Sequence, residues 1–83
     1  MKDQNFAIIE EFRGVMPAVF AGTQIGERTG GTFEWTYFRN MRKKWNIPEE
    51  CFIHSGNKLL IVRDVFLDWW LEQLTSEEGG AHA

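Results

Sequence analysis

Residues 32–63 read TFEWTYFRNMRKKWNIPEECFIHSGNKLLIVR, and this stretch carries the clearest structural pattern of the chain. At 100° per residue, five apolar side chains of its first part fall within an arc of about 140°: Phe33, Tyr37, Phe38, Met41 and Trp45. The opposite arc is mainly cationic and hydrogen-bonding: Trp35, Thr36, Arg39, Asn40, Arg42 and Lys43. The pattern predicts an amphipathic helix over residues 33–45, with Thr32 as its N-cap, whose apolar arc faces the core and whose cationic arc faces solvent. Asn46 and Ile47 stop this helix, because a residue before proline is pushed out of the α region.

The second part of the stretch predicts a β-hairpin and a closing helix. Two β-rich runs, residues 51–54 and 59–62, flank the link Ser55-Gly56-Asn57-Lys58. Glycine and asparagine inside so short a link are typical of hairpins. After the hairpin, Asp64 is the predicted N-cap of a helix over residues 65–74, which is apolar around most of its circumference.

The segments outside this stretch are less regular. Residues 6–12 (FAIIEEF) have helical or extended character, and residues 22–29 form a short helix that ends at the glycine pair 30–31. We expect an α+β fold, mainly α, with one domain over residues 17–74. Residues 1–16 form an N-terminal segment that packs on its core, and residues 75–83 form a flexible acidic tail.

The predicted order is helix, tight turn, helix, hairpin, helix. With these residues it resembles the excisionase-like or MerR-like winged helix-turn-helix family of phages and mobile elements. The resemblance runs from about residue 17 to residue 74, and five stretches carry it: ERTGG (27–31), TFEWTYFRNMRKK (32–44), IP (47–48), FIHSGNKLLIV (52–62) and RDVFLDWW (63–70).

The resemblance implies sequence-specific binding of duplex DNA. The helix after the glycine turn would enter the major groove, and the hairpin would be the wing that lies on the backbone or in the minor groove. The implied role is that of an excisionase-type recombination directionality factor or a small phage regulator. Its partners would be double-stranded DNA and either an integrase or further copies of the chain on adjacent sites.

The charge distribution is compatible with this expectation, although the whole chain carries a net charge of −3. Residues 28–63 carry seven basic and three acidic residues, while the rest of the chain carries two basic and nine acidic ones. Association with a charged partner depends on the local field rather than on the total charge. A basic middle between acidic ends therefore leaves nucleic acid open as a partner.

The candidate DNA contacts are polar or cationic residues of the long helix, the hairpin and the first short helix: Arg28, Thr36, Arg39, Asn40, Arg42, Lys43, Ser55, Asn57 and Lys58. Arginine binds guanine O6 and N7 in a bidentate manner, and asparagine does the same at adenine N6 and N7. Arg42 and Lys44 are either phosphate contacts or plain surface. The hairpin residues either touch phosphate and the minor groove or serve only the turn. For Gln24 and Arg28, a backbone contact and plain surface are equally supported.

Other functions find little support in the sequence. Cys51 is the single cysteine, so no intramolecular disulfide forms, and Cys51 with His54 supplies too few ligands for zinc. No phosphate-binding loop or catalytic triad is present, so we expect no enzyme activity, cofactor or metal. The absence of a signal-like or membrane-spanning run predicts a cytoplasmic protein that binds neither a membrane nor a small-molecule substrate.

Two alternatives remain open. A protein-interaction module on the same fold would use the acidic ends and an exposed tryptophan, either Trp35 or one of Trp69 and Trp70. These two neighbours cannot both face one side of a helix, so one of them covers another chain or lies beneath residues 6–12. The third possibility is single-strand binding through base stacking on Trp35.

Overall fold

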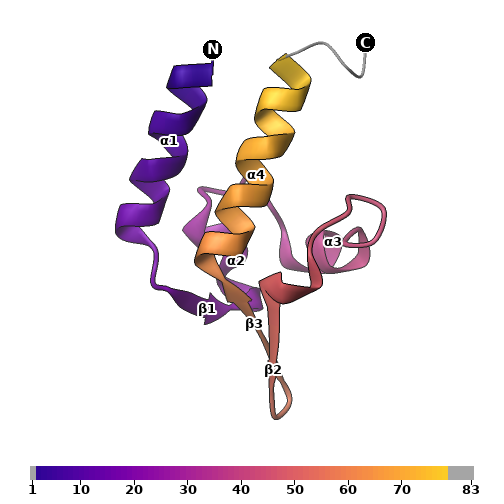
Figure 1. Ribbon diagram of the computed structural model, residues 1–83. Coiled ribbons are helices and arrows are strands. Elements are labelled where there is room, and N and C mark those ends of the chain that lie inside the picture. The colour runs from indigo at the N-terminus through magenta and orange to yellow at the C-terminus, as the bar shows by residue number, and fades with distance from the viewer. Residues whose placement is uncertain (1, 79–83) are drawn as a thin grey trace.

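The computed structural model describes residues 2–78, which form four α-helices, two short 3₁₀ helices and three strands (Figure 1). The elements follow in the order α1 (Lys2–Val15), β1 (Val19–Ala21), η1 (Gly22–Gln24), α2 (Ile25–Arg28), α3 (Trp35–Asn40), η2 (Glu49–Cys51), β2 (Phe52–Ser55), β3 (Lys58–Val62) and α4 (Arg63–Glu78). The α+β prediction is confirmed.

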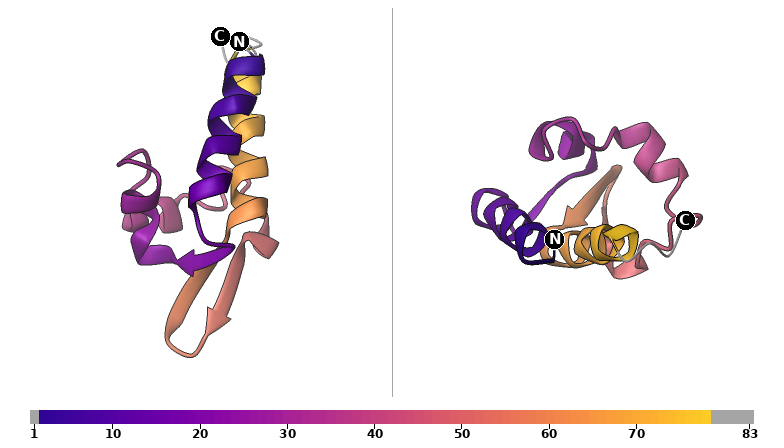
Figure 2. Two further views of the ribbon diagram at one scale, coloured as in Figure 1. Left: turned by 90° about the vertical axis from the view of Figure 1, so that its left-hand side faces the viewer. Right: turned by 90° about the horizontal axis from the view of Figure 1, so that it is seen from above.

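The helices lie in two groups above a small sheet. Helices α1 and α4 run antiparallel side by side, and α2 and α3 lie together on one side of this pair (Figure 2). The hairpin of β2 and β3 projects from the end of the molecule opposite the outer ends of α1 and α4. Within residues 2–78, no helix combines the length and the apolar character needed to cross a membrane.

The hairpin is confirmed, and a third strand joins it. The sheet is antiparallel with the order β1-β3-β2, and Phe20 of β1 pairs with Ile61 of β3. Both side chains are buried, so β1 contributes to the core on the side of the sheet that faces the helices. Strand β1 was not predicted, because a three-residue strand has too few positions to show an alternating pattern in the sequence.

The turn after α2 follows the prediction closely. Gly30 and Gly31 both have positive φ, which L-residues with a Cβ avoid. The Gly31 N–H donates to the Gly26 carbonyl at 2.7 Å and the Gly30 N–H donates to the Glu27 carbonyl at 3.4 Å, the pair of bonds of a Schellman motif. The helix predicted over residues 22–29 is divided between η1 and α2, and its end at the glycine pair is confirmed.

Helix α1 is longer than the sequence predicted and packs on α4. Ile9 is fully buried, and the Phe12 ring lies 5.1 Å from the Trp70 ring. Arg13 donates to Asp64 at 2.7 Å and to Asp68 at 3.0 Å, which joins the two helices near the sheet. Trp70 therefore lies against the N-terminal segment, which was one of the two alternatives for the tryptophan pair.

Helix α4 differs from the prediction at both ends. It begins at Arg63, so Asp64 lies in its first turn and is not its N-cap. Arg63 follows β3 directly, without a loop. Its backbone N–H donates to the Ala18 carbonyl, and its guanidinium donates to the carbonyls of Arg13 and Met16. The helix continues to Glu78, four residues beyond its predicted end at Leu74, so residues 75–78 of the predicted tail are helical. His82 and the rest of that tail lie outside the described residues.

Candidate nucleic-acid interface

Helix α3 is shorter than predicted and differently capped. The Glu34 carboxylate accepts the Tyr37 N–H at 3.0 Å and is the N-cap, so the prediction of Thr32 as cap is wrong. The Thr32 hydroxyl instead donates to the Thr29 carbonyl and closes the preceding turn. The prediction of helix over residues 33–45 holds for residues 35–40 only.

Residues 41–46 form hydrogen-bonded turns in place of the predicted helix. Asn46 has a φ of 58°, and the Ile47 N–H reaches back to the Arg42 carbonyl at 2.9 Å. This second Schellman-type ending buries Ile47 and brings the Trp45 carbonyl to the indole N–H of Trp69, 3.1 Å away. Burial of the Trp45–Ile47 segment against α4 thus overrides the continuation of the helix.

Phe38 fixes the orientation of α3. Its side chain is fully buried and its ring lies 5.6 Å from Phe66. Thr36 and Asn40 are exposed, and at 100° per residue they project from the side of the helix opposite Phe38. Arg39 is exposed between these directions. We call Thr36, Arg39 and Asn40 the α3 face; the structure places all three predicted contacts in solvent.

Trp35 supports this face and is not an exposed aromatic surface. It is half-buried, and it lies so close to Gly22 that a Cβ there would overlap its ring. The Arg39 guanidinium carbon lies 5.7 Å from the ring centroid, a cation–π distance. Trp35 therefore holds the Arg39 side chain while its own ring covers η1. Tyr37, in contrast, was predicted in the core and is 58% exposed.

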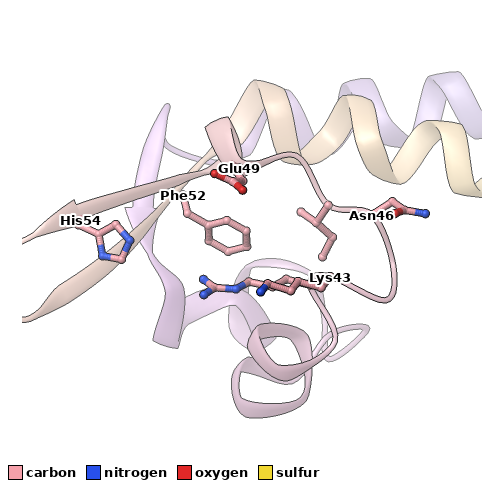
Figure 3. A pocket seen from close by; sticks show the side chains of 7 residues that line it. Lys43, Asn46, Glu49, Phe52 and His54 are labelled. Carbon is pink, nitrogen blue, oxygen red and sulfur yellow. The ribbon is translucent and has the colours of Figure 1, made fainter.

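A hollow of about 750 Å³ separates the turns after α3 from strand β2 (Figure 3). This space is called the hollow from here on, and seven residues line it: Arg42, Lys43, Asn46, Ile47, Glu49, Phe52 and His54. The Arg42 guanidinium carbon lies 5.5 Å from the Phe52 ring centroid, so strand β2 anchors it. Lys43 lies on the wall opposite Phe52 and Glu49, and His54 lies farther out along β2.

Arg42 and Lys43 were predicted contacts, but on a continuous helix. His54 and Glu49 were not predicted to be part of the same site. An alternation signal was present for His54, because Phe52 and His54 are two residues apart on one strand and share a face. Glu49 carried no such signal, since its place depends on how η2 folds back beside residues 42–47.

The hairpin residues form a separate group. Gly56 has a φ of 62° and opens a two-residue turn, while Ser55 and Lys58 form the last pair of the ladder. Ser55, Asn57 and Lys58 are all exposed at the hairpin tip. Because successive side chains alternate between faces, Ser55 and Lys58 project from the face opposite His54.

Arg28 and Arg63, both counted in the basic middle of the chain, do not reach the hollow. Arg28 is half-buried at the end of α2, and its Nε is buried without a hydrogen-bond partner. Arg63 is bound to Asp64, and together with Arg13 it holds the pKa of that carboxyl below its usual value through hydrogen bonds. Gln24 is exposed in η1.

Three acids of the two long helices are held by Arg13 and do not line the hollow. Glu10, Asp64 and Asp68 all accept hydrogen bonds from Arg13. Cys51 is buried, which raises its pKa to about 12, and His54 is exposed. Among the described residues, no three His, Cys, Asp or Glu side chains gather in the arrangement of a metal site.

Comparison with known proteins yields no relative, since no family model, curated protein or solved structure matches this chain.

Proposed function

We propose that this chain is a sequence-specific duplex DNA-binding protein without catalytic activity. In this proposal α3 enters the major groove as the recognition helix of a winged helix-turn-helix, and the β2–β3 hairpin is the wing. The biological role suggested by the sequence resemblance is that of an excisionase-type recombination directionality factor or a small phage regulator. An integrase, or copies of the chain on adjacent sites, would be its protein partners.

One observation carries the proposal: Phe38 anchors α3 so that Thr36, Arg39 and Asn40 face solvent together. Arginine and asparagine are the side chains best suited to bidentate contacts with purine edges in the major groove. The Arg39 side chain is already oriented by Trp35, so less conformational entropy is lost when it binds a base. Lys58 and Asn57 at the hairpin tip are available for backbone contacts.

The protein-interaction alternative relied on an exposed tryptophan. All four tryptophans of the chain lie among the described residues; Trp69 and Trp70 are buried, and Trp35 and Trp45 are half-buried. Single-strand stacking on Trp35 is disfavoured for the same reason, because its ring already covers Gly22.

The test begins with selection of tight-binding duplexes from a randomised library. Arg39→Ala and Asn40→Ala should each cost about 1–3 kcal/mol on the selected site and much less on random duplex. Lys58→Ala should weaken both about equally and reduce the salt slope by about one. Gln73→Ala, which removes an exposed amide from α4, is the control and should bind as the parent does. If no duplex is enriched, or if Arg39→Ala binds the selected site with parental affinity, the proposal is wrong.

A further inference from the structure

The hollow lies between α3, which the proposed function places in the major groove, and β2 of the wing, which would lie on the backbone or in the adjacent minor groove. A helix in the major groove and a hairpin in the adjacent minor groove are separated by one sugar–phosphate strand, because that strand is the wall between the grooves. Here the hollow between α3 and β2 is lined by two permanent cations, Arg42 and Lys43, and by one histidine of β2, His54. The position and the charge of the hollow both suit that strand.

We propose that the sugar–phosphate strand of bound duplex DNA runs through the hollow, where Arg42, Lys43 and protonated His54 contact its phosphates. This inference rests on the proposed function and assigns to that function a binding site and a dependence on pH. Arg42 is the anchored member of the three, because its guanidinium carbon lies at a cation–π distance of 5.5 Å from the Phe52 ring centroid. Guanidinium groups are suited to phosphate because their donors match its oxygens in a bidentate manner.

His54 makes the site sensitive to pH. Histidine is the side chain whose charge ordinarily changes between about pH 5 and pH 8, and a phosphate favours its protonated form. The charged groups that share its side of the hairpin are Arg42 and Lys43 from the turns after α3 and Glu49 from η2. Its partner on β3 is Leu59, which carries no charge, and Lys58 projects from the other face. DNA binding should therefore take up a proton at His54 and strengthen as the pH falls.

Glu49 opposes the anion in the same hollow. Its side chain lines the wall of the hollow opposite Lys43, and it forms no ion pair with Arg42 or Lys43 within 4.0 Å. A phosphate bound there would be repelled by this charge. Glu50, the next residue, is also exposed but does not line the hollow, so it provides a matched control of equal charge.

The first experiment measures binding of a mixed-sequence duplex by fluorescence anisotropy at about pH 6 and about pH 8, in a salt series. The parent should bind about tenfold more tightly at the lower pH in dilute salt, with a salt slope steeper by about 0.9, because one more phosphate is neutralised. His54→Gln should lose both differences. His82→Gln removes the other histidine of the chain and should retain them. Thermal melts at both pH values establish that every variant is folded.

The second experiment compares Glu49→Gln with Glu50→Gln on the same duplex. Glu49→Gln should strengthen binding about threefold or more at both pH values, and Glu50→Gln should have at most half that effect on a logarithmic scale. The inference is overturned if His54→Gln keeps the parental pH dependence, or if the two glutamine variants bind equally. If the parent binds DNA in either case, the proposed function is retained although the inference is wrong. Absence of binding by the parent at both pH values would instead overturn the proposed function and the inference with it.

Discussion

Phe38→Ala is the substitution that tests how α3 is held. The side chain is fully buried, and its ring lies 5.4 Å from Phe33, 5.6 Å from Phe66 and 6.1 Å from Trp69. Truncation of a buried phenylalanine costs about 3–5 kcal/mol, and the edge-to-face contacts with three rings place this one in the upper half of that range. A chain of 83 residues has a free energy of unfolding of roughly 4–12 kcal/mol. The variant should therefore lose about a third or more of this free energy of unfolding.

Tyr37→Ala is the matched control on the same helix. Tyr37 is 58% exposed, and its one aromatic contact is with Trp45 at 5.5 Å, so its truncation should cost about 1 kcal/mol. Urea unfolding followed by tryptophan fluorescence measures both variants. With a slope of about 1–2 kcal/mol per molar, the midpoint should fall by about 2 M or more for Phe38→Ala and by less than about 1 M for Tyr37→Ala. Equal midpoint shifts in the two variants would show that the buried face of α3 is assigned wrongly.

Three other perturbations follow from the contacts. Gly22→Ala should destabilise the fold by about 1–3 kcal/mol, because the new Cβ overlaps Trp35. Gly14→Ala, with open space around the new Cβ, should change the unfolding free energy by less than about 1 kcal/mol, and parallel thermal melts of the two variants measure the difference. Hydrogen bonds from Arg63 and Arg13 lower the pKa of Asp64, so its stabilising effect is present at neutral pH and is lost as the pH falls through that lowered value. Asp64→Asn should therefore lower stability by at most about 1 kcal/mol at pH 7 and converge with the parent near pH 2, and an equal deficit at both pH values would contradict this. Burial raises the pKa of Cys51 to about 12, so iodoacetamide should label the thiol at about pH 8 in urea but not in the native protein, as mass spectrometry can establish.

The predictions from sequence held where a few neighbouring residues specify the backbone. The hairpin and the end of α2 are of this kind. Gly56 and the pair Gly30–Gly31 adopt positive φ, and the bonds they permit lie within six residues of chain. Such signals are readable because side-chain sterics alone restrict those conformations.

The predictions failed where distant residues decide. Periodicity placed Tyr37 in the core and Trp35 outside it. In the structure Tyr37 is exposed, and the Trp35 ring packs on Gly22, thirteen residues earlier, where the absence of a Cβ leaves room for it. The helix was extended to Trp45 because the apolar pattern continued, although the Trp45 carbonyl is held by Trp69 and the chain turns to bury Ile47. Neither contact is present in the local pattern.

For the candidate site, the sequence by itself determined which residues of α3 and the hairpin carry cationic and hydrogen-bonding groups. It determined as well that a glycine turn precedes that helix and that a hairpin follows it, because helix ends and tight turns depend on local backbone sterics. Only the tertiary structure decided that Arg42 and Lys43 leave the helix and share a hollow with Glu49 and His54. It also decided that the Arg63 guanidinium donates to the carbonyls of Arg13 and Met16 and that a three-residue strand closes the core. These features depend on segments up to about fifty residues apart in the chain, which meet only when burial of the aromatic core brings them together.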